Sequence, residues 1–258
     1  MEKGYESTLK LWQTFNIQTV DDLDDALRNF RVLFAYHSGK IENRDIDYHD
    51  TREIFENGKV LNFTGDPRTL FEQQNQKLCY DFLKDKIVEK EPLTLPLVLE
   101  IHSILTAGTY DEKRYIAKGE RPGALKKHDY VTGIHEVGYP PDEVENALSE
   151  LLDEISMPES AKDPALSAAY FHARFEYIHP FADGNGRVGR TLLNYFLMIY
   201  NHPPLIIHDE DKAVYYDALA AYDNSEDLGP MTAFLRQQLE RTWEKTLDRE
   251  QRRKDKVR

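Results

Sequence analysis

Residues 179–190 read HPFADGNGRVGR, and helical signals flank this stretch on both sides. Upstream, Asp163 is an N-cap followed by a first-turn proline, and apolar residues then recur at helical spacing. Downstream, positions 192, 193 and 195–200 are all apolar, which is typical of a central, buried helix. The pattern predicts a loop between two helices, with residues 184–186 at the N-terminus of the buried one.

The residue types of this loop suit a polyphosphate held beside a proton acceptor. Free backbone N–H groups at a helix N-terminus bind anions, and glycine lets the backbone approach a phosphate closely. Arg187 and Arg190 are three residues apart, share a helix face and offer planar forks for phosphate oxygens. Asp183 can bind Mg²⁺, which keeps water and phosphate oxygens as its other ligands. His179 has an ordinary pKa near neutrality and is the candidate general base.

The same stretch resembles the signature of the Fic-domain family, His-x-Phe-x-(Asp/Glu)-Gly-Asn-Gly-Arg-x-x-Arg, at every fixed position. Members are all-helical and mostly transfer AMP from ATP to a Ser, Thr or Tyr hydroxyl of a protein. The resemblance implies that His179 is the base, that Phe181 anchors the loop and that Asp183 holds Mg²⁺ or Mn²⁺. It further implies that ATP phosphates are held by Gly184, Asn185, Gly186, Arg187 (β-phosphate) and Arg190 (γ-phosphate).

A second stretch, SGKIEN at residues 38–43, resembles the family's inhibitory motif (Ser/Thr)-x-x-x-Glu-(Gly/Asn). Family members with this motif near the N-terminus form class II. Ser38 and Glu42 share one helix face, and a carboxylate is a natural competitor of a phosphate for a guanidinium. The resemblance implies that Glu42, in a motif closed by Asn43, pairs with Arg190 and blocks seating of the γ-phosphate.

Two other segments resemble family elements less specifically. Residues 123–133, followed by two prolines, resemble the β-hairpin flap that binds the target as an added strand. Strand is expected only around Lys127–Val137, and the target-binding flap residues would be Lys127, His128, Asp129, Tyr130 and Val131. Tyr216, in a predicted late helix, would contribute to the adenine pocket. The resemblance extends from about Ser38 to about Arg241.

The fold class predicted is all-α, a Fic-type helical bundle with one small β-hairpin. We expect an N-terminal helical extension (1–37), the inhibitory motif (38–43), the Fic core (44–241) and a C-terminal helix end and tail (242–258). The segment containing Leu11 and Trp12 should pack on the bundle as an extension. Cap and period signals predict helices at 21–36, 38–42, 48–56, 66–90, 95–107, 141–155, 164–178, 186–201, 210–222 and 228–248.

Composition limits the remaining functions. The net charge of −13 argues against broad nucleic-acid binding, and no apolar run reaches membrane-spanning length. The single cysteine, Cys79, excludes an intramolecular disulfide, and the polar, charged N-terminus lacks a signal peptide. Both features favour a cytoplasmic location, where ATP is plentiful.

The interpretation is therefore a magnesium-dependent, autoinhibited protein adenylyltransferase whose partners are ATP and a protein target, the chain itself included. Kinase-type relatives carry lysine where Gly186 stands, so Gly186 favours nucleotidyl transfer. Two enzyme alternatives remain: use of another nucleotide, and removal of AMP with Glu42 positioning a water. A non-catalytic binding module is a third alternative, against which the intact His179 and Asp183 argue. The oligomeric state is left open, with a homo-oligomer allowed.

Overall fold

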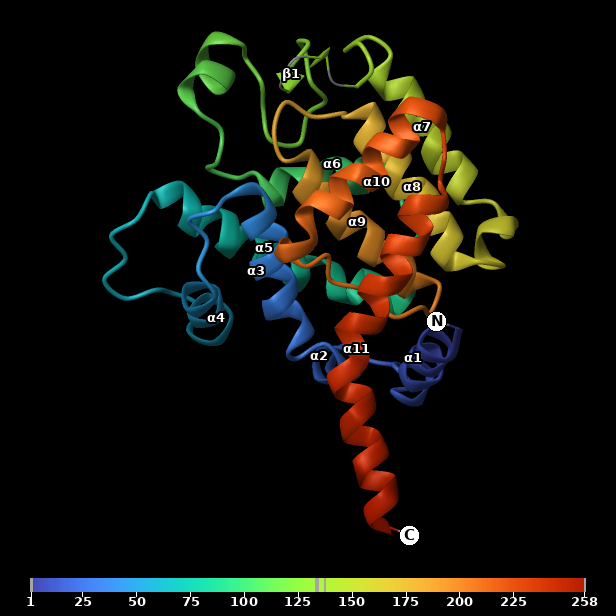
Figure 1. Cartoon of the computed structure of the whole chain (residues 1–258). Coiled ribbons are helices and arrows are strands. Elements are labelled where there is room, and N and C mark those ends of the chain that lie inside the picture. Colours follow the sequence, from blue (N-terminus) through green and yellow to red (C-terminus); the bar gives the residue numbers. More distant parts are fainter. Residues whose placement is uncertain (1, 133–134, 137, 258) are drawn as a thin grey trace.

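Two helices, α8 (Pro164–Ile178) and α9 (Asn185–Ile199), form the centre of the structure, a computed structural model that describes residues 2–132, 135, 136 and 138–257. α8 begins as predicted, because the Asp163 carboxylate accepts a hydrogen bond from the Leu166 N–H. α9 is buried along most of its length. It packs against α8, α3 (Phe30–Glu42), α5 (Pro67–Glu89) and α6 (Leu95–Leu105), which places the loop between α8 and α9 at one end of the bundle (Figure 1).

The other elements pack around this centre. The longer ones are α1 (Glu2–Thr14), α2 (Val20–Ala26), α4 (Tyr48–Asn57), α7 (Val144–Ile155), α10 (Lys212–Ser225) and α11 (Gly229–Val257). Single turns are the π-helical η1 (Lys113–Ala117) and the 3₁₀-helical η2 (Pro158–Ala161) and η3 (Asp209–Asp211). Among the described helices, none is both long and apolar enough to cross a bilayer.

The prediction of one helix over 21–36 and a separate short helix over 38–42 is wrong. The chain turns at residues 27–29, so that α2 ends at Ala26 and α3 runs unbroken from Phe30 to Glu42. Leu23, Leu27 and Phe30 are all buried in the same core cluster. The apolar periodicity is therefore satisfied by two helices that meet at a turn. The consequence is that residues 38–42 form the last turn of a long helix.

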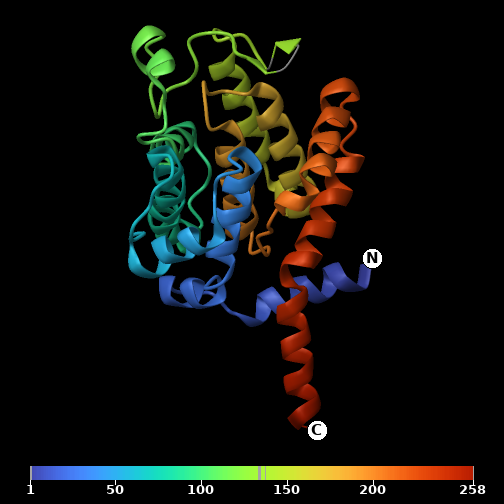
Figure 2. The same ribbon diagram turned by 60° about the vertical axis from the view of Figure 1, so that its left-hand side comes forward.

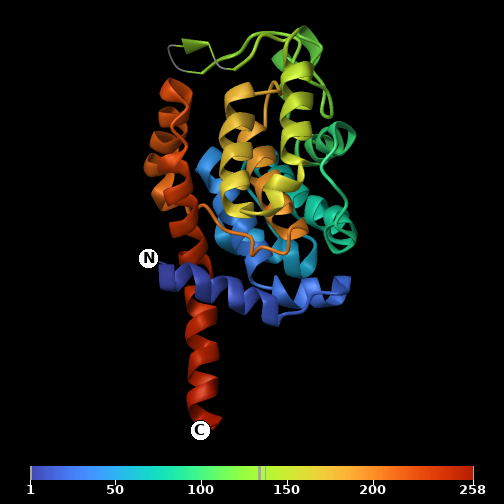
Figure 3. The same cartoon turned by 90° about the vertical axis from the view of Figure 1, so that its right-hand side faces the viewer.

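The N-terminal segment packs on α11, as predicted. Leu11 and Trp12 are buried, and the Trp12 ring lies edge-on to the Trp243 ring at 5.5 Å between centroids. α11 then continues well past α1 and leaves the bundle, so its last turns project from the molecule (Figures 2 and 3). α3 and α11 run without interruption across the domain boundaries predicted at 37/38 and 241/242.

Two short strands lie at the end of the bundle that carries the α8–α9 loop. β1 (Val131–Thr132) and β2 (His135–Glu136) pair antiparallel within the range where the sequence predicts a hairpin, while residues 133, 134 and 137 lie outside the described part. The flanking chain is tied to the loop, because the Lys126 N–H donates to Pro180 O (2.9 Å) and the Tyr139 N–H donates to Ile178 O (3.0 Å). Gly138 permits this approach, since a Cβ there would lie 2.5 Å from Ile178 O.

Candidate active site

The loop between α8 and α9 is held rigidly from within. His179 ends α8 in the left-handed region at φ 52°, an uncommon conformation for a non-glycine residue that is often found at functional sites. Phe181 is completely buried, and its ring stacks on the His102 ring at 3.7 Å between centroids. The His102 Nε2 lies 3.1 Å from Asp183 O, and its Nδ1 accepts a hydrogen bond from the Gly123 N–H. Phe181 therefore anchors the loop, as the resemblance implied.

The side chain of Asn185 closes the loop. Its side-chain Oδ1 accepts from the Phe181 N–H (2.9 Å), and its Nδ2 donates to Phe181 O (2.8 Å). Both ends of the amide are therefore used to close the loop. Only the backbone N–H of Asn185 is left for the predicted contact with a phosphate. Gly184, at φ +84°, starts α9, and a Cβ there would lie 2.6 Å from the Thr106 side chain.

A pocket of about 570 Å³ opens at the N-terminus of α9. It brings together most of the predicted site with residues from α3, α5 and η1. The lining residues are Glu42, Asn43, Arg44, Arg68, Glu72, Arg114, Tyr130, His179, Ala182, Asp183, Gly184, Asn185, Gly186 and Arg187. Of the predicted nucleotide-binding residues, Arg190 and Tyr216 are not part of this lining. Tyr216 is exposed on α10. Its neighbour Tyr215 is buried and hydrogen-bonded to His172.

Arg187 is buried without strong partners. Its side chain is 3% exposed, and its Nη1 lies 3.5 Å from a Glu72 carboxylate oxygen. Its Nη2 lies 3.9 Å from Asp183. Within the described residues, the Nε and Nη1 of Arg187 have no hydrogen-bond partner. Unsatisfied N–H groups of a buried guanidinium are costly, so a ligand anion in the pocket is the natural partner.

Arg190 is held tightly by the motif at the end of α3. Its Nη2 donates to Glu42 Oε1 (2.8 Å) and to Ser38 O (2.9 Å), and its Nε donates to Ser38 Oγ (3.0 Å). The predicted ion pair between Glu42 and Arg190 is therefore present. Gly186 makes room for it, because a Cβ there would lie 2.3 Å from Glu42 Oε1. Arg190 Nη1 still lacks a partner within the described residues.

Glu42 is ionised in this arrangement and remains open to the pocket. Burial pushes the pKa of the Glu42 carboxyl up, but Arg190, then Arg187 and Lys212, hold this pKa below its usual value. About a third of the side chain, 34%, is exposed. Asn43, the last residue of the motif, donates to Glu72 Oε2 (2.8 Å) and so fixes the end of α3 to α5. The motif thus joins three helices around the pocket.

Asp183 is suited to a divalent cation. Its Oδ2 accepts from Arg68 Nη2 (2.9 Å), and its Oδ1 accepts from the Gly184 N–H (2.9 Å). A single partly exposed carboxylate at a phosphate-binding pocket matches the way proteins bind Mg²⁺, which retains water and phosphate oxygens. Glu72 differs from Asp183 in accessibility, because its side chain is 3% exposed against 18% for Asp183, and its oxygens accept from Arg68 (3.0 Å) and Asn43 (2.8 Å). The residues present therefore fit one carboxylate-bound Mg²⁺ that needs a phosphate to complete its shell.

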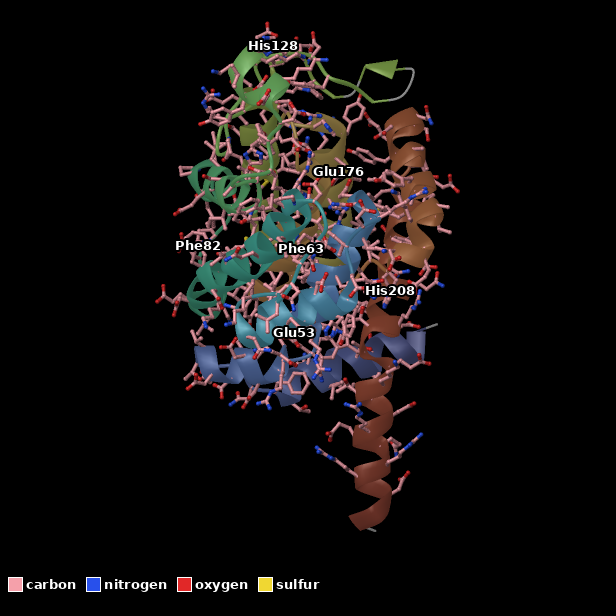
Figure 4. The ribbon with its side chains drawn as sticks, turned by 90° about the vertical axis from the view of Figure 1, so that its left-hand side faces the viewer. Glu53, Phe63, Phe82, His128, Glu176 and His208 are labelled. Atoms are coloured by element: carbon pink, nitrogen blue, oxygen red, sulfur yellow. The ribbon has the colours of Figure 1, made fainter. Side chains whose placement is uncertain are left out.

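Two ionisable groups near the pocket have strongly shifted pKa values. Burial, followed by the positive charge of Lys126, lowers the pKa of His179 to about 4. His179 is therefore neutral at neutral pH and can accept a proton. Burial also raises the pKa of Glu176 to about 8, with Arg190 opposing this shift. Figure 4 labels Glu176 in the upper half of the molecule, and its Oε1 is buried, with a Cβ on Gly189 only 2.3 Å away if one were present.

The structure adds functional residues that the sequence reasoning missed. Arg68 and Glu72 lie on α5 and hold Asp183 and Arg187, and Glu120 holds the segment before β1. Glu72 and Glu120 are buried carboxylates, a state that no local pattern reveals. A signal existed only for Arg68, which follows the Asp66-Pro67 helix start in the first turn of α5, where a cation opposes the helix dipole. The predicted flap residues Lys127 and His128 are bound by Glu120, and Tyr130 reaches the pocket.

These features define a site for a polyphosphate beside a neutral imidazole, at the N-terminus of a buried helix. The sequence profile of the Fic/DOC family matches residues 92–197, which include the whole α8–α9 loop. The match identifies residues 92–197 as a Fic/DOC-family domain, and the resemblance seen in the sequence is confirmed.

Two curated relatives are named as Fic protein adenylyltransferases. The chain is 27% identical over 244 residues to protein adenylyltransferase fic-1 of Caenorhabditis elegans, covering 91% of this chain and 44% of the relative. It is 30% identical over 240 residues to protein adenylyltransferase Fic of Aedes aegypti, covering 88% of this chain and 44% of the relative. The chain spans less than half the length of these relatives.

Solved structures share the fold. A Fic-domain-containing signaling protein from Bacteroides thetaiotaomicron superimposes with a TM-score of 0.80 at 23% identity, covering 95% of both chains. A Fic-1 fragment from Caenorhabditis elegans gives a TM-score of 0.77 at 25% identity, covering 100% of this chain and 73% of that one. The all-α prediction is confirmed by this likeness.

Proposed function

We propose that this protein transfers AMP from ATP to a hydroxyl group of a protein and releases pyrophosphate. The observation that carries the proposal is the buried Arg187, which lines the pocket beside His179 and the N-terminus of α9 with N–H groups that lack partners among the described residues. Arg190, one turn further along α9, is buried with its Nη1 likewise unpartnered there. The names of the curated relatives support it.

Separate residues of the site carry out proton transfer, phosphate binding and metal binding in the proposed reaction. His179, neutral at physiological pH, removes the proton from the target hydroxyl. The resulting oxygen attacks the α-phosphorus, the bond to the β-phosphate oxygen breaks, and pyrophosphate leaves. Arg187 and the backbone N–H groups that open α9 hold the phosphates and stabilise their charge. Mg²⁺ on Asp183, when bound, would neutralise charge on the phosphate oxygens.

We further propose that the protein is autoinhibited in the class II manner. Arg190 is the partner that the γ-phosphate requires, and Glu42 occupies it at 2.8 Å. ATP can enter the pocket while Glu42 stays in place, but its γ-phosphate must then lie elsewhere. The α-phosphorus is consequently turned out of line with the attacking hydroxyl, and small misplacements of this kind cost about 10²-fold in rate. The paired strands β1 and β2 would act as the flap, to which the target adds as a further strand.

A labelled-nucleotide assay tests the activity. The Glu42→Gly variant is incubated with ATP, GTP, CTP or UTP labelled in the base, and in parallel with ATP labelled at the γ-phosphate. We expect protein-bound label from base-labelled ATP and none from the γ-phosphate. His179→Ala should lower the rate by about 10²–10⁴-fold while ATP still binds, because other groups hold the phosphates. His49→Ala, on the exposed face of α4, is the matched control. Transfer of the γ-label instead would make the protein a kinase.

A titration tests the metal. Asp183→Asn should abolish the contribution of Mg²⁺ to ATP affinity measured by calorimetry, because the amide removes the negative charge but keeps the shape. ATP binding in the absence of metal should change little. Equal Mg²⁺ dependence in the variant and the parent would place the metal elsewhere.

A further inference from the structure

The segment from η1 to the strands is strongly basic in an acidic protein. Residues 113–127 read KRYIAKGERPGALKK, with six lysines and arginines and one glutamate, whereas the whole chain has a net charge of −13. The glutamate, Glu120, is buried. Lys126 is buried and Arg114 pairs with Asp111. The positive charge at the surface of this segment therefore comes from Lys113, Lys118, Arg121 and Lys127.

The same segment exposes apolar side chains. Ile116 is 74% exposed, more than any other large apolar side chain in the described part of the chain, and Tyr115 beside it is also exposed. Both lie on the π-helical turn η1, a form of helix that is often found at functional sites. An exposed apolar pair with basic neighbours is typical of a surface that contacts a protein partner.

Three of the positive charges, on Lys118, Arg121 and Lys127, are not cancelled by carboxylates among the described residues. The Arg121 guanidinium lies 3.9 Å from the centre of the Tyr115 ring, and Lys118 Nζ lies 4.3 Å from the centre of the Tyr130 ring. Lys127 Nζ donates to Gly119 O at 2.9 Å. Among the described residues, none of these three cations lies within ion-pair distance of an acidic group. Aromatic rings and carbonyls position the cations but leave their net charge intact.

The buried Glu120 holds this surface in a fixed shape. Its carboxylate accepts hydrogen bonds from the Lys127 N–H (3.1 Å), from Tyr130 OH (2.9 Å) and from His128 Nδ1 (2.9 Å). Figure 4 shows His128 at the end of the molecule beside the strands. Arg114 Nε donates to Ala182 O (3.2 Å) and ties η1 to the catalytic loop. The surface is therefore preorganised and adjoins the pocket that contains His179.

We propose that Tyr115, Ile116, Lys118, Arg121 and Lys127, named here the basic ridge, bind an acidic segment of the protein target next to its modified hydroxyl. This inference rests on the proposed function and adds the chemistry of the partner. Acidic side chains complement the three uncancelled cations, and the exposed Ile116 and Tyr115 provide apolar contact for the same peptide. A polypeptide fits better than a nucleic acid, because the acidic remainder of the chain repels a long phosphate backbone.

Binding is measured first, on the full chain without nucleotide. The probes are fluorescent random copolymers of glutamate and tyrosine and of lysine and tyrosine, and the readout is anisotropy. We expect the acidic copolymer to bind and the basic one not to bind. The double reversal Lys118→Glu, Arg121→Glu should weaken binding at least about tenfold, and added salt should weaken it in the parent. Arg253→Glu, a charge reversal on the 79%-exposed side chain at the projecting end of α11, is the control and should change little.

Three results would overturn the inference. They are equal binding of the two copolymers, equal weakening by the control reversal, and binding of a thymidine oligonucleotide as tightly as the acidic copolymer. Thermal unfolding and ATP affinity of the double reversal should match those of the parent. A loss of either would show that the two cations support the fold or the nucleotide site instead of docking a partner.

Kinetics then separate docking from catalysis. In the Glu42→Gly background, the double reversal should raise the KM for the acidic copolymer about tenfold, with kcat and the KM for ATP unchanged. Acidic-copolymer binding without AMP transfer to any substrate would refute the proposed function and leave the ridge intact. AMP transfer with an unchanged KM for the acidic copolymer in the double reversal would refute docking at the basic ridge and leave the proposed function intact.

Discussion

Arg187 and Arg190 lie one turn apart on the same face of α9, yet their surroundings differ. Arg187 faces α5, where a Glu72 carboxylate oxygen lies 3.5 Å away, and the Asp183 carboxylate of the loop lies 3.9 Å away. Two nitrogens of Arg187 lack partners in the described residues. Arg190 faces α3, where Glu42 and Ser38 accept three hydrogen bonds at 2.8 to 3.0 Å.

The difference shows how one site can be ready to bind phosphates at Arg187 while Glu42 blocks its second arginine, Arg190. Loose contacts hold Arg187 in position while leaving its N–H groups for a ligand. The close contacts of Arg190 require a ligand to displace a carboxylate that is already in place. Competition between a ligand and Glu42 for the Arg190 guanidinium can therefore control a site whose other parts are complete. Four experiments test this contrast between the two arginines.

The largest effect is expected from the arginines themselves. In the Glu42→Gly background, Arg187→Ala and Arg190→Ala should each lower AMP transfer by about 10²–10⁴-fold, because each removes charge-assisted hydrogen bonds worth about 1.5–3 kcal/mol apiece. The two should differ when Glu42 is restored. Restoring Glu42 should further inhibit Arg187→Ala and leave Arg190→Ala unchanged, since the carboxylate acts through Arg190. Rates of self-modification in the four variants provide the measurement, and inhibition of both by Glu42 would break the comparison.

The next effect is activation. Glu42→Gly should raise self-modification about 10²-fold over the natural chain, because the γ-phosphate gains Arg190 and the α-phosphorus comes into line. Ser38→Ala should activate less, since it removes one of the three bonds and leaves the carboxylate. A Glu42→Gly rate no higher than that of the natural chain would falsify the inhibitory role.

A smaller effect is expected on stability. Glu42→Gly should reduce the free energy of unfolding by about 1–2 kcal/mol, because Arg190 loses its carboxylate while a third of the Glu42 side chain was already in water. Activity and stability should thus change in opposite directions. Thermal unfolding with and without ATP·Mg²⁺ checks this, and ATP should stabilise the variant more than the parent. A variant as stable as the parent would show that Glu42 does little to hold Arg190.

The smallest effect concerns pH. With the pKa of free His179 lowered to about 4, kcat/KM should stay level from pH 7 to about 5 and fall only below that range. Lys126→Gln removes the positive charge that disfavours the imidazolium, so this pKa should rise toward its ordinary value of about 6.5 by less than one unit. The acid limb should move to higher pH by the same amount. Lys127→Gln, whose ammonium is bound to Gly119 O, should leave the limb in place; an equal shift in both variants would exclude a specific role for Lys126.

Local signals explain which parts of the fold were predictable. Asp163 caps α8 by bonding to a residue three positions along the chain, and the apolar run after residue 191 can only be buried. α8, α9 and the loop between them therefore followed from the sequence. The break between α2 and α3 did not, because Leu23, Leu27 and Phe30 continue one apolar pattern across the turn. The loop-closing role of the Asn185 side chain was also not predicted, since it depends on two hydrogen bonds between its amide and the backbone of Phe181.

The sequence by itself determined the all-α class and the residue types of the 179–190 loop, because capping, helical period and a dense motif depend on near neighbours. The pairing of Glu42 with Arg190, 148 residues apart, was implied by the family resemblance. Only the tertiary structure decided which arginine is free, that Glu72 and Arg68 support the site from α5, and that Glu120 shapes the basic ridge. These contacts join positions up to 115 residues apart, as between Arg68 and Asp183. Their existence depends on how the apolar faces of the helices pack, and that packing is the one quantity that no local pattern contains.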